Sequence, residues 1–469
     1  MSVSPSAHRL LVALLLILVT TSVWSNDEIS SDSRDRQTLG LTVYNGDLAL
    51  VRDRRTLTLP SGRTWLAFAD VSAQIRPESA RLHGGPTVLE QRFDFDLLSP
   101  EKLLEHSVGQ SVGLVRIDPD TGTEYRQQGT LLSVNGSGVV FRIDDRIETG
   151  GPDSPWRFVF DKIPATVRQQ PTLSLLLDSA RADNYPLELT YLTQGLSWQA
   201  DYIATLASSG RSLELTGWIT LTNTSGTDYP DAVLQLLAGD VNQVPEVMAL
   251  ADESAMSARA TGLPRQERLF EYHLYSLDRP TTLADNQTKQ VLLMQADTVP
   301  VRREYRVDVG FPYIADGESA GQPLAARILL RFGNSPPALG DPLPAGIVRF
   351  YQRDSEGDIQ FIGENRIEHT PEGRVLELAV GNAFDVTAER RQTHFRQGED
   401  NQREIGWAID LFNAKPEPVE VVVQANFPGQ WQMLDESVGS ERVGVTLARW
   451  TVPVAAKGQA TLRYRVLLD

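Results

Sequence analysis

Acidic, imidazole and phenol side chains alternate along one short stretch of the chain. Glu271, His273 and Tyr275 are separated by single residues, and alternate residues of a β-strand point to the same face. Groups of this kind on one face can bind a metal ion or relay a proton. No second histidine lies at a useful spacing, so we favour a hydrogen-bonded cluster on the sheet. We therefore predict no metal site and no cofactor.

The segment Asp278–Gln290 is a second candidate site, because long connections between strands often carry function. Asp285, Asn286 and Lys289 lie close together in it. A Lys–Asn crosslink is chemically possible there, with Glu271 as the proton carrier. Residues so near in sequence rarely need a covalent link. We therefore favour an ordered loop packed between two domains over a ligand site.

Two acidic turns and one tryptophan complete the candidates. Residues 118–122 (DPDTG) and 354–358 (DSEGD) carry carboxylates at alternate positions, but both lack the full calcium-loop pattern, so ordinary turns are favoured. Trp431 follows Pro428-Gly429 and is the best candidate for an exposed ring that stacks on a sugar. Trp198 and Trp218 lie within expected strands, where aromatic rings usually fill cores.

Composition and missing motifs exclude several functions. The chain has 469 residues, 44 Lys and Arg against 61 Asp and Glu, a net charge of −17 and no cysteine. An acidic surface argues against nucleic-acid binding, and the lack of cysteine removes disulfides, thiol catalysis and cysteine-bound zinc. The sequence contains no nucleophile elbow, phosphate loop, dinucleotide fingerprint or His-Glu-x-x-His motif.

The N-terminus has the parts of a secretory signal peptide. Arg9 precedes the apolar run Leu10–Val19, and small residues lead to Ser25 and a polar junction. We predict cleavage after Ser25 and a periplasmic or secreted protein, with an uncleaved anchor as the alternative. A lipoprotein is excluded, because acylation needs a cysteine. No later stretch is long and apolar enough to form a transmembrane helix.

Strand patterns follow almost without interruption, and they predict an all-β fold of tandem antiparallel, immunoglobulin-like β-sandwiches with a small inserted β subdomain and few short helices. Asn45-Gly46 predicts a type I′ hairpin turn, and Ser99-Pro100-Glu101 predicts a short helix to Glu105. Residues 249–259 are the central candidate for a helical or disordered segment. The expected parts are a signal peptide (1–25), a polar spacer (26–37), an N-terminal β domain (38–170) with an insertion at about 97–150, a central sandwich region (171–390) and a C-terminal sandwich (391–469).

Several stretches resemble a bacterial family of exported domains of unknown function, whose C-terminal sandwich is shared with mucoidy-inhibitor-A-like proteins. The matching stretches are Leu41–Val51, Leu192–Tyr202, Ala238–Asn242, Glu271–Tyr275, Asp278–Gln290 and Gly381–Thr387. Such relatives usually carry a long coiled coil between their halves, but this chain has no sustained heptads. The resemblance implies a fold and an exported location, and it implies no catalytic residues.

These features predict a non-enzymatic binding or scaffolding protein of the bacterial envelope. Its partner is an envelope protein or a polysaccharide, bound through sheet edges, loops or clefts. The sequence carries no signal for an oligomeric state. The alternative is a glycoside hydrolase-like enzyme that acts on envelope or extracellular polysaccharide, since acidic residues are abundant enough to supply a carboxylate pair.

Overall fold

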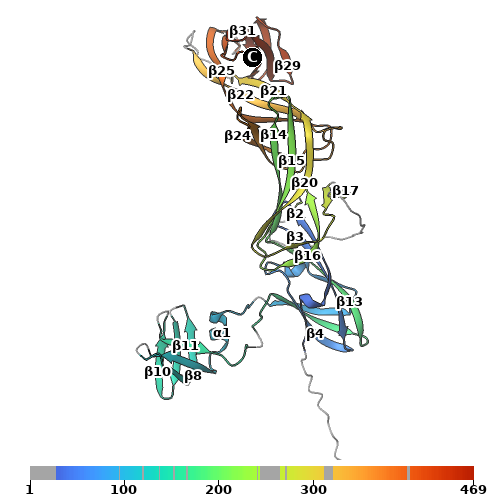
Figure 1. Ribbon diagram of the computed structural model, residues 1–469, viewed down its shortest axis with the longest axis vertical. Coiled ribbons are helices and arrows are strands. Elements are labelled where there is room, and N and C mark those ends of the chain that lie inside the picture. The colour runs from blue at the N-terminus through green and yellow to red at the C-terminus, as the bar shows by residue number, and fades with distance from the viewer. Residues whose placement is uncertain are drawn as a thin grey trace, which may run out of the picture. The chain divides into compact units, whose positions relative to one another are not determined.

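The computed structural model describes residues 28–468, apart from residues 95, 119–120, 137, 152–153, 165–166, 240, 243–264, 270–271, 311–320 and 399–401. The predicted all-β fold is confirmed: strands in several sheets make up most of the described residues, and the one α-helix among them is α1 (Pro100–His106) (Figure 1). The expected signal peptide and the segment 249–259 lie outside the described residues.

Contacts divide the chain into two units, and each is described by itself. The first comprises residues up to 36, 55–71 and 84–187, and the second comprises residues 37–54, 72–83 and 188–469. The first unit contains a four-stranded sheet in the order β1-β4-β12-β6. Its strands are β1 (Ile29–Ser31), β4 (Gly62–Ala69), β12 (Thr172–Ser179) and β6 (Thr87–Asp94). Residues 29–31 belong to the expected polar spacer, but they form a strand because they pair in parallel with β4.

An inserted module follows β6 in the first unit. Ser99 caps α1, its side chain accepting a hydrogen bond from the Lys102 amide at 3.1 Å, so the helix begins where the sequence predicts. The module's five-stranded sheet has the order β10-β9-β8-β7-β11. It extends beyond the expected limit of residue 150, because β11 pairs with β7. The strands are β7 (Ser111–Ile117), β8 (Glu124–Asn135), β9 (Gly138–Ile143), β10 (Arg146–Gly150) and β11 (Trp156–Val159).

An eight-stranded sheet has the order β17-β18-β16-β2-β3-β13-β5, with β19 paired to β16. Its strands are β2 (Arg36–Tyr44), β3 (Ala49–Leu59), β5 (Arg81–His83), β13 (Asp183–Thr193), β16 (Tyr229–Ala238), β17 (Arg265–Leu269), β18 (Tyr272–Ser276) and β19 (Thr281–Leu283). Short 3-10 helices occur at Ser33–Asp35 and Pro77–Ser79.

The predicted type I′ turn at Asn45-Gly46 is wrong. Neither residue has a positive φ, and β2 and β3 are joined by residues 45–48, with a hydrogen bond from the Tyr44 amide to the Leu48 carbonyl. Asn45 instead uses its side chain in tertiary contacts: its amide nitrogen donates to the Trp198 carbonyl at 3.4 Å, and its oxygen accepts from the Gly239 amide at 3.3 Å. These contacts favour a wider loop than the tight turn that Asn-Gly pairs commonly form.

A five-stranded sheet in the second unit has the order β20-β15-β14-β23-β24 (Figure 1). Its strands are β14 (Leu196–Leu206), β15 (Ser212–Asn223), β20 (Gln287–Pro300), β23 (Gly346–Arg353) and β24 (Ile359–Ile367). β14 and β15 pair without interruption over eleven positions. Their residues alternate between buried and polar faces, as the sequence pattern predicts.

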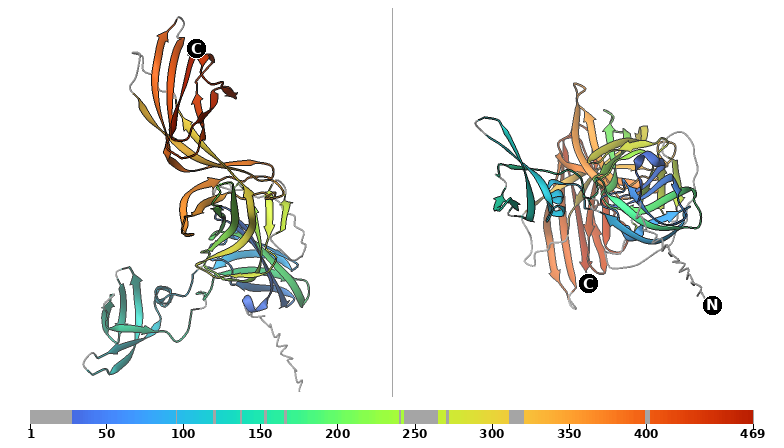
Figure 2. Two further views of the ribbon diagram at one scale, coloured as in Figure 1. Left: turned by 45° about the horizontal axis from the view of Figure 1, so that its top comes forward. Right: turned by 90° about the horizontal axis from the view of Figure 1, so that it is seen from below.

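The C-terminal sheet has nine strands in the order β28-β31-β26-β25-β22-β21-β27-β30-β29, and its long strands run side by side (Figure 2). It takes strands from both sides of residue 391, because β25 crosses that position as one strand of 23 residues. The strands are β21 (Arg302–Asp308), β22 (Gln322–Gly333), β25 (Val375–Gln397), β26 (Arg403–Asn413), β27 (Val419–Asn426), β28 (Trp431–Glu436), β29 (Glu441–Val443), β30 (Leu447–Val454) and β31 (Gly458–Leu468).

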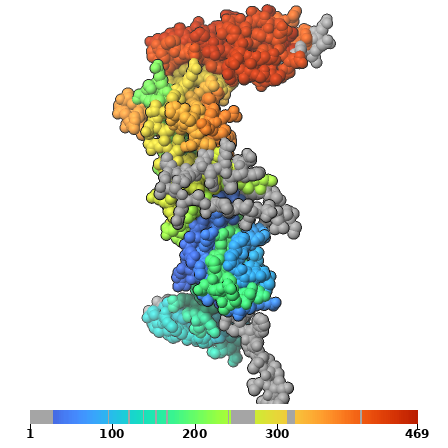
Figure 3. All heavy atoms as spheres, turned by 90° about the vertical axis from the view of Figure 1, so that its right-hand side faces the viewer, coloured from blue at the N-terminus to red at the C-terminus, as the bar shows by residue number. Residues whose placement is uncertain are grey.

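The core of this sheet is aromatic and aliphatic. Trp450 is fully buried and stacks on Tyr464 at 4.6 Å between ring centroids. Its indole nitrogen donates to the Glu436 carboxylate at 2.9 Å, so the buried ring keeps a partner for its polar atom. The atoms of the C-terminal strands form a continuous close-packed body (orange to red in Figure 3).

Buried tyrosines make the second unit sensitive to alkali. The Tyr202 hydroxyl donates to the Pro344 carbonyl at 2.9 Å, and burial raises its pKa well above the ordinary 10. The unfolded chain loses this proton near pH 10 while the folded chain keeps it. Stability is therefore complete below pH 10 and falls above it, by about 1.4 kcal/mol per pH unit for each such group.

We expect the urea midpoint to fall between about pH 8 and pH 11, and to fall less in Tyr202→Phe, which has no phenol to titrate there. Tyr125→Phe is the matched control, because Tyr125 is 47% exposed. Circular dichroism during urea titration measures the midpoints. An equal fall in Tyr202→Phe and in the unchanged protein would contradict the prediction.

Candidate functional site

The residues predicted as a polar cluster are only partly described. Glu271 lies outside the described residues. His273 and Tyr275 lie on one face of β18, opposite Ala238 and Leu236 of β16. Tyr275 is 4% exposed, donates its hydroxyl to the Pro342 carbonyl at 3.0 Å and packs edge-on against Trp198. Burial raises its pKa, so this phenol stays protonated and serves packing.

The segment 278–290 is not the long loop that the sequence predicts: it forms β19, a short turn and the start of β20. The Lys289 amine donates to the Thr281 hydroxyl at 2.6 Å and to the Thr282 carbonyl at 3.0 Å. Asn286 takes the positive φ of the turn and donates to Asp285. The other Asp285 oxygen accepts from the Gly226 amide at 2.9 Å. These contacts close a turn, and the structure does not bring Lys289 and Asn286 into contact.

The contacts of Trp431 and Asp354 show what these two candidates do in the fold. Trp431 is 8% exposed rather than an open stacking platform, because it packs on Phe427 and under the Arg442 guanidinium. Its indole nitrogen donates to the Val445 carbonyl. Asp354 accepts hydrogen bonds from the backbone amides of its own turn and from the Gln360 side chain, which is mainly responsible for its lowered pKa. Within the described chain, no three metal-binding side chains gather.

The pairing of β25 with its neighbours is interrupted in the middle of the strand. Ala325 pairs with Thr387 and Arg327 pairs with Asn382, so a single residue of β22 faces residues 383–386 of β25. The ladder also skips Val380. Bulges of this kind re-aim side chains and often lie beside functional sites.

β24 carries a third interruption. Phe350 of β23 pairs with Gly363 and Tyr351 pairs with Phe361, so Ile362 is skipped. The skipped segments of β24 and β25 face one cavity, which we call the bulge pocket. It has a volume of about 280 Å³ and is lined by Leu206, Arg303, Tyr305, Ile328, Leu330, Gln352, Ile362, residues 380–386 and Lys415.

Phe384 lines the bulge pocket and is highly exposed. Its side chain is 95% exposed, more than any other large apolar residue of the described chain. The floor is apolar, since Leu206, Tyr305 and Leu330 are buried. Polar groups surround it: the amides Gln352 and Asn382, the cations Arg303 and Lys415, and the carboxylate Asp385. Apolar and polar groups therefore contribute to the lining in similar measure, and a ligand that fills the pocket must satisfy both.

The bulge pocket is a site that residue patterns did not reveal. The stretch Gly381–Thr387 carries a family resemblance, and its residue types predict no chemistry. One signal lies within it: Gly381-Asn382 interrupts a strand pattern, and glycine within a strand often marks a bulge.

Comparison with family models identifies the family of the second unit. The model described as a domain of unknown function (DUF4139) matches residues 187–468. The chain belongs to this family. The bulge pocket lies entirely within the DUF4139 region. No curated protein matches the chain at a significant level.

The structure also bears on membrane insertion. Among the described residues, no helix has the length and apolar character needed to span a bilayer.

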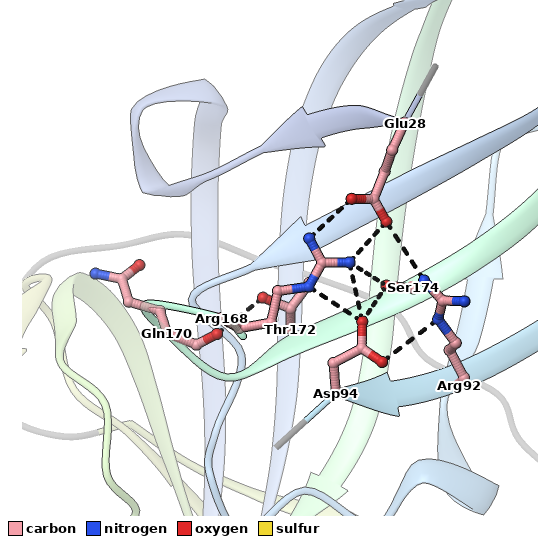
Figure 4. Close-up of polar contacts among 7 residues, drawn as sticks. All are labelled: Glu28, Arg92, Asp94, Arg168, Gln170, Thr172 and Ser174. Carbon is pink, nitrogen blue, oxygen red and sulfur yellow. Dashed lines mark hydrogen bonds and ion pairs between the residues drawn. The ribbon is translucent and has the colours of Figure 1, made fainter. Parts of the chain in front are cut away.

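Outside the DUF4139 region, charged residues of the first unit form a second cluster (Figure 4). The Arg168 guanidinium binds Glu28 with two hydrogen bonds of 2.7 and 2.8 Å and binds Asp94 at 3.0 and 3.2 Å. Ser174 donates to Asp94 at 2.8 Å, and Arg92 lies 3.4 Å from the same carboxylate. The bonds to Glu28 are the largest cause of the raised pKa of Arg168. Two cations balance two carboxylates, so the cluster has no charge left for a ligand.

The backbone shows what this cluster holds together. Leu97 and Arg168 form a parallel bridge where the chain enters and leaves the inserted module. The Arg168 amide donates to the Asp96 carbonyl at 2.9 Å, and the Leu98 amide donates to the Arg168 carbonyl at 2.8 Å. Arg168 therefore links the two connections of the inserted module to Glu28, the residue before β1.

We expect Arg168→Gln to destabilise this junction by about 1 to 2 kcal/mol, because Glu28 and Asp94 lose the hydrogen bonds from Arg168 and keep only the longer contacts to the half-exposed Arg92. Hydrogen exchange measured by mass spectrometry reports the opening of the junction, through the backbone amides of residue 168 and Leu98. Arg157→Gln is the control, because Arg157 is 63% exposed and pairs with Glu124 inside the module. Equal exchange rates in Arg168→Gln and the unchanged protein would show that the cluster does not close the junction.

Proposed function

We propose that this DUF4139 protein is a non-enzymatic binding or scaffolding protein of the bacterial envelope and that its partner binds at the bulge pocket. The proposal rests on one observation: Phe384 is 95% exposed at the rim of a pocket with an apolar floor. Such exposure of a large ring to water is unfavourable, by roughly 1.5–3 kcal/mol relative to a buried position. A partner that covers Phe384 recovers this free energy.

The backbone supports a recognition role for this ring. Residues 383–386 of β25 lie opposite Ala326 alone in the pairing with β22, and Phe384 within this bulge is exposed. The strand resumes pairing at Val386 with β26 and at Thr387 with β22. Because both flanks are anchored in the sheet, the ring is presented with little loss of conformational entropy on binding.

The pocket lining favours binding over glycoside hydrolysis. Hydrolysis of a glycosidic bond ordinarily uses two carboxylates on opposite sides of the bond. Among the described residues that line the bulge pocket, Asp385 is the one carboxylate, and no tryptophan is present to stack on a sugar ring. The polysaccharide-hydrolase alternative therefore finds no support at this site.

The envelope location is part of the same proposal. It rests on the signal-peptide pattern that ends at Ser25. Removal of the leader places the folded chain in the periplasm or outside the cell, where an envelope protein or polysaccharide is accessible to it.

Photo-crosslinking in cells that naturally contain the protein tests the proposal. With benzoyl-phenylalanine at position 384, we expect one dominant adduct with an envelope component, identified by mass spectrometry. The matched control carries the probe at position 361, because Phe361 is 56% exposed, packs against Tyr351 and lies outside the pocket lining. No adduct at 384, or the same adducts at both positions, would overturn the proposal.

A further inference from the structure

The polar rim of the bulge pocket differs in charge from the chain as a whole. The chain has a net charge of −17, whereas the pocket lining contains Arg303, Lys415 and one acidic residue, Asp385. Lys415 pairs with Glu417 at 3.3 Å. No ion pair joins Arg303 to another described residue, although its neighbour Arg302 pairs with Glu420. The pocket therefore presents one uncommitted guanidinium beside an apolar floor.

A guanidinium in this position binds an oxyanion, and its fork fits both carboxylate and phosphate groups. Its planar fork donates two parallel hydrogen bonds that match the two oxygens of a carboxylate group. The ligand that satisfies both parts of the pocket therefore carries an apolar group next to an oxyanion, and in an unmodified polypeptide that oxyanion is a carboxylate.

The volume limits the apolar group. A cavity of about 280 Å³ lies at the lower end of the range for ligand pockets. It accommodates one aromatic or branched aliphatic side chain, and it is too small for a long acyl chain.

Side-chain amides also line the bulge pocket. The ladders of β25 skip Ala383 and Phe384 on the side of β22, and pairing with β26 begins at Val386. Gln352 and Asn382 at the rim offer amides that both donate and accept hydrogen bonds. A peptide chain matches such groups, because each of its residues carries one donor and one acceptor.

We propose that the occupant of the bulge pocket is a segment of a partner protein in which one large apolar side chain lies next to a carboxylate. The apolar side chain fills the floor formed by Leu206, Tyr305 and Leu330 beneath Phe384. The carboxylate binds Arg303. This inference rests on the proposed function, and it names the chemistry that the binding protein recognises.

Two probes that differ only in charge test the inference. N-acetyl-phenylalanine carries the carboxylate, and N-acetyl-phenylalaninamide replaces it with a neutral amide. We expect the purified full chain to bind the acid about tenfold more tightly than the amide, as a partly exposed charge-assisted contact allows. Saturation-transfer NMR titration measures both affinities, and added salt should reduce the difference because it screens the charge.

Three variants assign the preference to its residues. Arg303→Gln should bring the acid to the affinity of the amide. Phe384→Ala should weaken both probes. Arg302→Gln is the matched control, because Arg302 is adjacent, 80% exposed and absent from the pocket lining, and it should keep the preference. Thermal unfolding followed by circular dichroism verifies that each variant is folded.

Equal affinities of the unchanged protein for acid and amide, or an unchanged preference in Arg303→Gln, would overturn the inference. Binding that depends on Phe384 without a preference for the acid would leave the proposed function in place. Absence of binding by either probe up to the solubility limit would also overturn the inference. In that case the crosslinking at position 384 still tests the proposed function, because it uses neither probe.

Discussion

Backbone hydrogen bonding along β25 is the constraint on which the rest of the C-terminal structure depends. This strand of 23 residues pairs with β22 along its first part and with β26 along its second. It is therefore shared by the two halves of the nine-stranded sheet. A ladder of this length tolerates an interruption, because the flanking pairs keep the backbone in register on both sides. The bulge at residues 383–386 is such an interruption, and it places Phe384 in solvent.

Alternation of side chains on β21 separates stability from recognition in the same short strand. Glu304 and Arg306 point to one face, where they form ion pairs with Arg331 and Glu377. Two cations and two carboxylates satisfy one another there, and Arg306 is 9% exposed. Arg303 and Tyr305 point to the opposite face and line the bulge pocket. The period of two that defines a strand thus keeps the balanced charges away from the guanidinium that faces the pocket.

Much of the local structure was predictable from residue types. The helix at Pro100–His106 begins after its Ser99 cap, and β14 and β15 follow the alternation of apolar and polar residues. These features depend on neighbours in the sequence, so a short window contains the causes. The turn at Asn45-Gly46 was not predictable in this way, because Asn45 is held by Trp198 and Gly239, which lie far away in the chain. Trp431 likewise follows a turn motif, but its burial is decided by packing on Phe427 and by the Arg442 guanidinium.

The sequence by itself determined that the chain is all-β, rich in acidic residues and free of cysteine, because composition and short-period patterns are local properties. It also contained the Gly381–Thr387 stretch, but without any sign of what that stretch does. Only the tertiary structure decided that Ile362 is skipped in the β23–β24 ladder, that Val380 and residues 383–386 are skipped in the β22–β25 ladder, and that all of them line one pocket. Strand pairing joins residues that are distant in sequence, and the register of each pair depends on every strand of the sheet. For that reason the position of the bulge, and with it the exposure of Phe384 beside Arg303, is a property of the folded chain.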